Sequence, residues 1–139
     1  MRFVLAVLAA ATVLFLLGAL QFVVLLPEYS RIHFAQIARP PADFSLLGVI
    51  VEKLLQAACL VMLYQMVLPT RHSFAVTAKF GAIVAVLLEG SWVLGTWNSY
   101  PLEFMPLLIL GVLAALRLMA ACLTVGLIYS RRPPTGDVS

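Results

Sequence analysis

The chain has 139 residues, of which 63% are apolar and only 11% are charged, and its formal net charge at pH 7 is +3. Soluble domains are about 45–50% apolar and about 25% charged, so this composition excludes an ordinary soluble protein. Apart from the adjacent Arg131 and Arg132, the basic residues lie singly along the chain and form no stripe that could follow a phosphate backbone, so we expect no nucleic-acid partner.

Four apolar segments are long enough to cross a membrane as helices: residues 3–26, 45–68, 74–97 and 104–129. A helix needs about 20 residues to cross roughly 30 Å of hydrocarbon, and none of the segments alternates as a barrel strand does. The sequence therefore predicts an all-α integral membrane protein. We expect residues 1–130 to form one four-helix bundle and residues 131–139 to form a polar cytoplasmic tail.

The first segment follows Arg2 and resembles a secretory signal in its apolar character. It is longer than the apolar core of a signal peptide, which has about 7–15 residues, so it predicts an uncleaved first span. Pro27 ends it. Between residues 27 and 44, apolar side chains such as Phe34 and Ile37 mix with charged ones, which is consistent with a short amphipathic surface helix or with a solvated loop.

The second segment begins near Asp43 and Ser45, either of which would cap a helix. Its polar and small residues share one helical face, which we expect to pack inside the bundle: Ser45, Gly48, Glu52, Gln56 and Cys59. Lys53 lies about 100° around the helix from Glu52, and we expect its side chain to extend toward the membrane surface.

The third and fourth segments each place small residues on the face that carries a charge. Glu89 shares its face with Gly81 and Ala85, and Arg117 shares its face with Ala114 and Ala121, so we expect these faces to meet at short range. The two faces comprise Ala78, Gly81, Ala85, Glu89, Trp92 and Thr96, and Leu110, Ala114, Arg117, Ala121 and Thr124.

The distribution of basic residues predicts the orientation. With the N-terminus inside, five basic residues flank the spans on the inner side and two on the outer side, which favours an N-in, C-in topology. The inner residues are Arg2, Arg71, Lys79, Arg131 and Arg132, and the outer ones are Arg31 and Arg39. Size and composition indicate a multi-pass protein of a bacterial inner (plasma) membrane.

Polar side chains of all four spans fall in the same half of the membrane or extend toward it. At 1.5 Å per residue, Glu52 is roughly 10 Å and Glu89 roughly 12 Å below the outer helix ends. Arg117 lies deeper, but its side chain leans toward the outer side, where the helix begins. Gln21 and Gln56 belong to the same half of the membrane. We therefore expect a polar cluster of these five residues inside the bundle.

Three interpretations of this cluster remain open. The first is a buried salt bridge between Glu89 and Arg117, with Glu52 satisfied by Gln56 or Lys53, which only fixes how the helices meet. The second is a hydrated pocket open to the outer face, in which a carboxylate binds a cation or a proton and Arg117 binds an anionic group or shifts the pKa of Glu89. The third is that some charges face a partner subunit. Trp92 lies one turn from Glu89 and would line the entrance to a site, whereas Trp97 and Tyr100 fit an interfacial aromatic belt.

Several kinds of chemistry have no support in the sequence. His33 and His72 fall on opposite sides of the membrane and cannot together hold a haem. Cys59 and Cys122 lie in apolar runs, as small buried side chains do, and no metal-ligand motif or phosphate-binding loop occurs. We expect no cofactor and no metal.

The sequence thus predicts a small non-enzymatic membrane protein. It would serve as an accessory subunit or bind a lipid or amphiphile, with membrane lipid and a homo-oligomer or larger membrane complex as partners. The alternative is a small proton- or cation-coupled transporter that uses Glu89. A weaker alternative is a membrane enzyme in which Glu52 or Glu89 acts as the general base.

Overall fold

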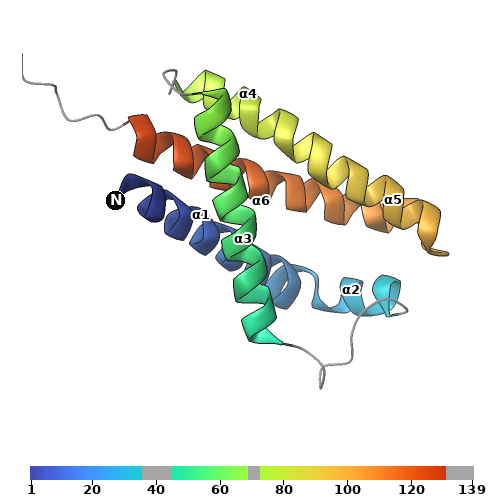
Figure 1. Cartoon of the computed structure of the whole chain (residues 1–139). Helices are drawn as coiled ribbons and strands as arrows, with labels where there is room; N and C mark the ends of the chain where they lie inside the picture. The colour runs from blue at the N-terminus through green and yellow to red at the C-terminus, as the bar shows by residue number, and fades with distance from the viewer. Residues whose placement is uncertain (36–44, 69–72, 131–139) are drawn as a thin grey trace, which may run out of the picture.

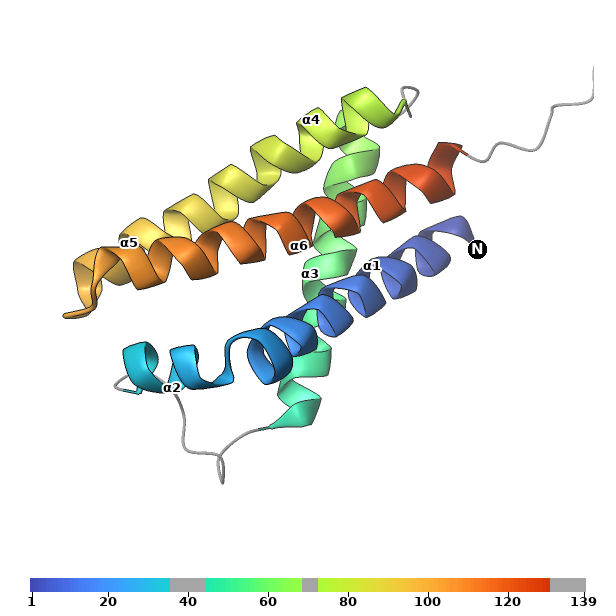
Figure 2. The ribbon, with the colours of Figure 1, turned by 180° about the vertical axis from the view of Figure 1, so that it is seen from behind.

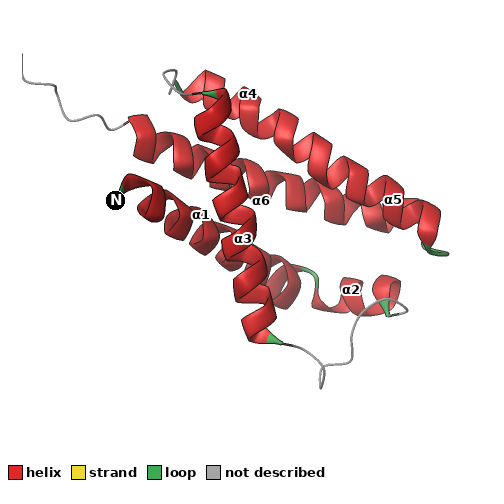
Figure 3. Ribbon diagram, in the orientation of Figure 1, coloured by secondary structure: helices red, strands yellow, loops and turns green. Residues whose placement is uncertain are grey.

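The structure is a computed structural model that describes residues 1–35, 45–68 and 73–130. Within these residues the regular elements are all helical (Figure 3). In chain order they are α1 (Arg2–Ala19), the π-helical segment η1 (Leu20–Leu25), α2 (Pro27–Phe34), α3 (Leu46–Val67), α4 (Phe74–Ala85), the π-helical segment η3 (Val86–Gly90), α5 (Ser91–Ser99) and α6 (Phe104–Ser130).

Four continuous helical stretches are long and apolar enough to span a membrane: Arg2–Leu25, Leu46–Val67, Phe74–Ser99 and Phe104–Ser130. Each agrees with its predicted segment to within two residues at either end, so the prediction of an all-α chain with four apolar helices is confirmed. Most of their large apolar side chains are exposed in the isolated chain, as lipid-facing side chains would be.

Hydroxyl groups cap two of the helices. The Ser45 Oγ atom accepts a hydrogen bond from the Gly48 backbone N–H at 3.1 Å, as predicted for the start of α3. The Ser73 Oγ atom accepts one from the Val76 N–H at 3.4 Å at the start of α4. Asp43, the other predicted cap, lies outside the described residues. Pro27 occupies the first turn of α2, where its missing N–H costs no hydrogen bond.

Three of the four long stretches lie side by side, and α3 crosses them. Figures 1 and 2 show α6 between α1 and the α4–α5 stretch, with α3 running steeply across the face of this layer. The N-terminus of α1 and the C-terminal end of α6 lie at the same end of the molecule (Figure 1). The layer is held mainly by α1 and α4 packing against α6, while α3 packs mainly on α1.

The main hydrophobic core lies where α1, α3, α4 and α6 meet. Alanines such as Ala10, Ala57 and Ala121 are fully buried there and allow the helix backbones to approach closely. The Tyr64 and Thr77 hydroxyls are hydrogen-bonded at 3.0 Å and join α3 to α4 inside this core. This hydrogen bond therefore holds the C-terminal end of α3 against the N-terminal end of α4.

The predicted four-helix bundle is not confirmed, because only the C-terminal half of α3 packs into the core. Its buried side chains are Ala57, Leu60, Val61 and Tyr64. For α3, the prediction of which face packs inside the bundle was wrong, since Gly48 and Cys59 on the predicted face are both exposed. The Tyr64 face buries more apolar surface and gains a hydrogen bond to Thr77, so it prevails over the stripe of small and polar residues.

The first connection begins with α2, which extends beyond η1 and packs against α5 and α6 (Figure 1). Phe34 is buried in a second apolar cluster with Val93, Leu107 and Leu110, from α5 and α6. Tyr29 also belongs to α2. Burial and the nearby negative charge of Glu103 raise the pKa of its phenol.

Of the two structures considered for residues 27–44, the helix is therefore present over residues 27–34, and it packs on protein through Phe34. Ile37 and the rest of this connection lie outside the described residues, as do four of the seven basic residues used for the orientation: Arg39, Arg71, Arg131 and Arg132.

Candidate functional site

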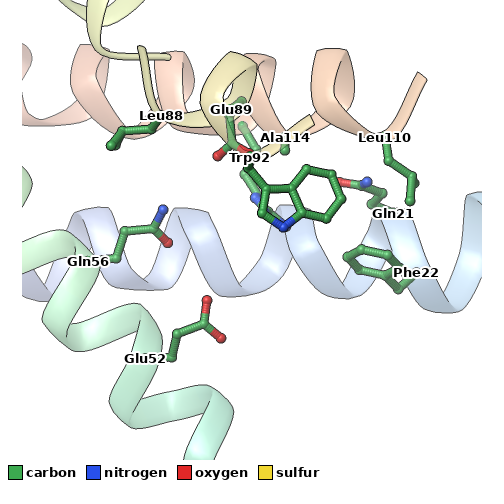
Figure 4. A pocket seen from close by; sticks show the side chains of 10 residues that line it. Gln21, Phe22, Glu52, Gln56, Leu88, Glu89, Trp92, Leu110 and Ala114 are labelled. Carbon is green, nitrogen blue, oxygen red and sulfur yellow. The ribbon is translucent and has the colours of Figure 1, made fainter. Parts of the chain in front are cut away.

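A pocket of about 460 Å³ opens where α3 diverges from the layer, and we call it the polar pocket. The six residues proposed from the sequence as binding candidates all line it: Gln21, Glu52, Gln56, Glu89, Trp92 and Arg117. Phe22, Leu88, Leu110 and Ala114 complete its wall. In Figure 4, Glu52 and Gln56 extend from α3 toward the side on which Glu89 and Trp92 lie.

The steep crossing of α3 explains why the pocket is open. Tyr64 holds the C-terminal end of α3 against α4, and α3 then runs away from α5 toward its own N-terminus (Figure 1). Glu52 and Gln56 lie on this diverging half, opposite Glu89 and Trp92 on the α4–α5 stretch. The charged groups of different helices therefore face one another across a space instead of touching.

On the α3 side, the charges are paired within the helix. The Lys53 Nζ atom lies 2.6 Å from Glu52 Oε1 and donates a weaker hydrogen bond to Gln56 Oε1 at 3.5 Å. The Lys53 side chain is only 12% exposed, so the prediction that it extends to the membrane surface was wrong. The adjacent carboxylate compensates the ammonium charge locally, which a lysine extending alone through lipid would not achieve.

Glu89 and Arg117 do not form the predicted buried salt bridge. Among the described residues, neither takes part in an ion pair within 4.0 Å. The Arg117 Nε atom is buried and has no hydrogen-bond partner there. The guanidinium group instead lies against α1, where a Cβ atom added to Gly18 would come within 3.0 Å of Arg117 Nη1. Packing against Gly18 thus holds the charge in the wall of the pocket.

Two π-helical segments carry part of the pocket wall. Gln21 and Phe22 belong to η1, where the Leu26 N–H donates to the Gln21 carbonyl oxygen five residues earlier at 2.9 Å. Leu88 and Glu89 belong to η3. In each segment two consecutive residues line the same pocket. Single π-helical turns within α-helices occur often at functional sites, because they change the direction in which side chains project.

A second cavity of about 440 Å³ adjoins the polar pocket, and we call it the apolar groove. It lies between α1 and the N-terminal half of α3 and is lined by Phe15, Gly18, Ala19, Phe22, Val23, Leu46, Val49, Glu52, Lys53 and Arg117. Phe22, Glu52 and Arg117 line both cavities. A space lined by charged and amide groups therefore lies beside one lined mainly by hydrocarbon, and the two share part of their walls.

Sequence reasoning missed two residues of the polar pocket, Phe22 and Leu88. Each adjoins a predicted site residue in the chain, and in a regular α-helix neighbouring residues point about 100° apart. No sequence signal marks the π-helical segments that bring both neighbours to the pocket. Leu110 and Ala114 were already placed on the Arg117 face by their helical spacing.

The polar pocket offers two charges without ion-pair partners, two amide side chains and aromatic rings. The described part of the chain holds no group of three or more histidine, cysteine or acidic residues that could bind a metal ion. These groups are suited to binding a polar or charged moiety by hydrogen bonds and charge. No protein-family model, curated protein or solved structure matches the chain.

Proposed function

We propose that this chain is a small non-enzymatic polytopic membrane protein that binds an amphiphile. The observation that carries the proposal is that the polar pocket and the apolar groove share three lining residues, Glu52, Phe22 and Arg117, and so lie next to each other. An amphiphile joins a polar head to a hydrocarbon chain. Two adjoining cavities of opposite character accommodate the two parts at once.

The dimensions of the two cavities support this function. Each has a volume of about 450 Å³, and pockets that bind small molecules are about 300–1,000 Å³ in size. Unpaired charges within an apolar helix are costly, by at least about 2.5 kcal/mol each on insertion scales. Retaining both Glu89 and Arg117 without a salt bridge is consistent with a role in binding.

The membrane setting completes the proposal. The chain would lie in the inner (plasma) membrane with both termini in the cytoplasm, which places the polar pocket in the outer half of the bilayer. Lipid in that leaflet would reach the apolar groove from the side. An oligomer or a larger complex would form through the exposed apolar faces of the four long helical stretches. The proposal therefore includes a role as an accessory subunit of such a complex.

Filling the pocket tests the function. Leu88 is half exposed and lines the polar pocket, so a Leu88→Trp substitution adds bulk there with little disturbance of the core. We expect it to weaken amphiphile binding about tenfold, which corresponds to about 1.4 kcal/mol. The measurement is native mass spectrometry of the delipidated full chain titrated with a phospholipid in detergent.

Leu94→Trp is the matched control, because Leu94 belongs to α5, is similarly exposed and does not line the pocket. It should bind as the wild type does. Equal affinities of all three proteins, or the absence of any bound amphiphile in the wild type, would contradict the proposed function.

A transporter is the second candidate, and the position of Glu89 favours it. This carboxylate lies in a π-helical segment beside an open pocket and has no ion-pair partner among the described residues, as a proton- or cation-coupling group would require. Proton flux into proteoliposomes that Glu89→Gln abolishes would favour transport over simple binding. Glu89→Gln leaves the size of the side chain almost unchanged, so lost flux would report the lost charge.

A further inference from the structure

We infer that the polar pocket selects a zwitterionic headgroup, with a phosphate beside Arg117 and a primary ammonium beside Glu89, while the acyl chain of the same lipid occupies the apolar groove. The inference rests on the proposed amphiphile-binding function and adds the chemical class of the ligand. The class follows from the charges of the pocket, from the donors and acceptors it presents, and from the residues that line both cavities.

The balance of charge in the pocket excludes simpler ligands. The negative charge of Glu52 is matched by Lys53 at 2.6 Å. One unpaired carboxylate, Glu89, and one unpaired guanidinium, Arg117, then remain. A purely anionic ligand would leave the negative charge of Glu89 uncompensated, and a purely cationic ligand would leave the positive charge of Arg117 uncompensated. Only a ligand with both signs compensates both groups within the low dielectric of the membrane.

The donors on the Arg117 side suit a phosphate. The Arg117 side chain lines both cavities, and a guanidinium binds phosphate oxygens through two parallel N–H groups. Gly18 lies against the guanidinium, and Arg117 belongs to the shared wall of the two cavities. A phosphodiester joins a lipid's headgroup to its hydrocarbon chains, so this wall is where its phosphate would lie.

The Glu89 side suits an ammonium group that can donate hydrogen bonds. The Glu89 carboxylate and the Gln56 amide oxygen are acceptors, and the indole of Trp92 lines the same pocket and attracts a cation to its face. A primary ammonium has three N–H donors, whereas a quaternary ammonium has none. The pocket therefore favours an ethanolamine-type headgroup over a choline-type one.

The apolar groove accommodates the chain end of the ligand. Phe15, Ala19, Val23 and Val49 give it a hydrocarbon wall. Three charged residues also line the groove: Glu52, Lys53 and Arg117. Glu52 and Lys53 pair with each other, and Arg117 would bind the phosphate. A lipid bound in this way enters from the bilayer without passing through water.

The test compares four amphiphiles with matched acyl chains on the delipidated full chain, by native mass spectrometry. They are phosphatidylethanolamine, phosphatidylcholine, phosphatidylglycerol and a cationic diacyl trimethylammonium amphiphile. We expect phosphatidylethanolamine to bind at least about tenfold more tightly than each of the other three, since each of them loses a charge-assisted hydrogen bond.

Two variants assign the two ends of the headgroup. Glu89→Gln should bring phosphatidylethanolamine and phosphatidylglycerol to equal affinity, because the ammonium loses its counter-charge. Arg117→Gln should reduce the preference over the cationic amphiphile to the size of the preference for phosphatidylethanolamine over phosphatidylcholine, because only the difference between a primary and a quaternary ammonium then remains. Glu103→Gln changes an exposed acidic residue outside the pocket and should keep the wild-type order of affinities. Should Arg117→Gln fail to fold, the near-isosteric Glu89→Gln decides, and an unchanged order in that variant contradicts the inference.

The outcome for the headgroup is separable from the outcome for the function. If all four amphiphiles bind with the same affinity, and Leu88→Trp weakens all of them, the proposed function stands and the zwitterion assignment is wrong. Tightest binding of the anionic or the cationic amphiphile contradicts the assignment in the same way. If none of the four binds, both the function and the assignment fail.

Discussion

Replacing Gly126 by leucine should separate α4 from α6 and lower the free energy of unfolding by about 3 kcal/mol. A Cβ atom at position 126 would lie 2.5 Å from Thr77 Cγ2 and 2.7 Å from Thr77 Oγ1. Thr77 is buried, β-branched and hydrogen-bonded to Tyr64, so it cannot rotate away without further loss. The contact has no room even for the Cβ atom, and leucine adds three more carbon atoms beyond it.

The measurement is the midpoint of unfolding in mixed micelles of mild detergent and sodium dodecyl sulfate. Gly95→Leu is the matched control, because a Cβ atom at Gly95 meets nothing within 4 Å, and it should change stability little. Gly126→Ala should fall between the two. Equal losses for Gly126→Leu and Gly95→Leu would mean that α4 and α6 do not pack as closely as the structure indicates.

Removing both free charges of the polar pocket should abolish tight ligand binding and leave the fold intact. In the double variant Glu89→Gln with Arg117→Gln, we expect the affinity for phosphatidylethanolamine to fall about 100-fold, from the loss of two charge-assisted hydrogen bonds. We expect the free energy of unfolding to stay the same or to rise by about 1–2 kcal/mol, because each unpaired charge is costly in the membrane.

The two readouts separate a binding site from a structural salt bridge. If the two residues formed a salt bridge that fixes the helices, each single variant, Glu89→Gln or Arg117→Gln, would be clearly less stable than the wild type, because the remaining charge would lose its partner, and ligand binding would not change. A site designed for binding shows the opposite pattern, since groups held ready for a ligand usually lower stability. The Leu94→Trp protein serves as a folded reference for both measurements.

The sequence predicted the four long helices well because their signal is local. Apolar length, the serine cap at residue 45 and the proline at residue 27 each act on neighbouring residues, and the helix bounds follow from them. The grouping of Gln21, Glu52, Gln56, Glu89, Trp92 and Arg117 around one pocket also followed from depth and helical spacing. Their role in binding stays a prediction.

The packing of α3 could not be predicted in the same way, because it depends on a comparison between two faces. The stripe with Gly48 and Cys59 looked suited to close contact, but the face with Ala57 and Tyr64 packs instead. The hydrogen bond between Tyr64 and Thr77 joins two separate helices, so no single segment carries its signal.

The absence of a Glu89–Arg117 salt bridge within the described chain has the same origin. Both residues were at suitable depths, but the diverging half of α3 opens a space beside them, and Gly18 on α1 provides a place for the guanidinium. The π-helical segments that carry Gln21 and Glu89 likewise have no local sequence mark. Where the charges point is therefore decided by tertiary structure.

The central claim, that a lipid enters the polar pocket, is tested most directly through the fluorescence of Trp92. The chain has two tryptophans, so Trp97→Phe leaves Trp92, in the pocket wall, as the single emitter. Trp92→Phe leaves Trp97, which packs on Phe104 at the end of α5 and does not line the pocket. The quencher is phosphatidylethanolamine brominated on the acyl carbons nearest the headgroup, so that the bromine lies close to the polar pocket, and it is added in small amounts to the delipidated protein in detergent.

The account predicts that Trp92 emission is quenched until one lipid is bound per chain, and that adding Glu89→Gln and Arg117→Gln removes this saturable phase. Trp97 emission should fall only weakly and without saturation. If Trp92 and Trp97 respond alike, or if Trp92 is quenched equally with and without the two charges, no lipid is bound in the pocket and the account is wrong.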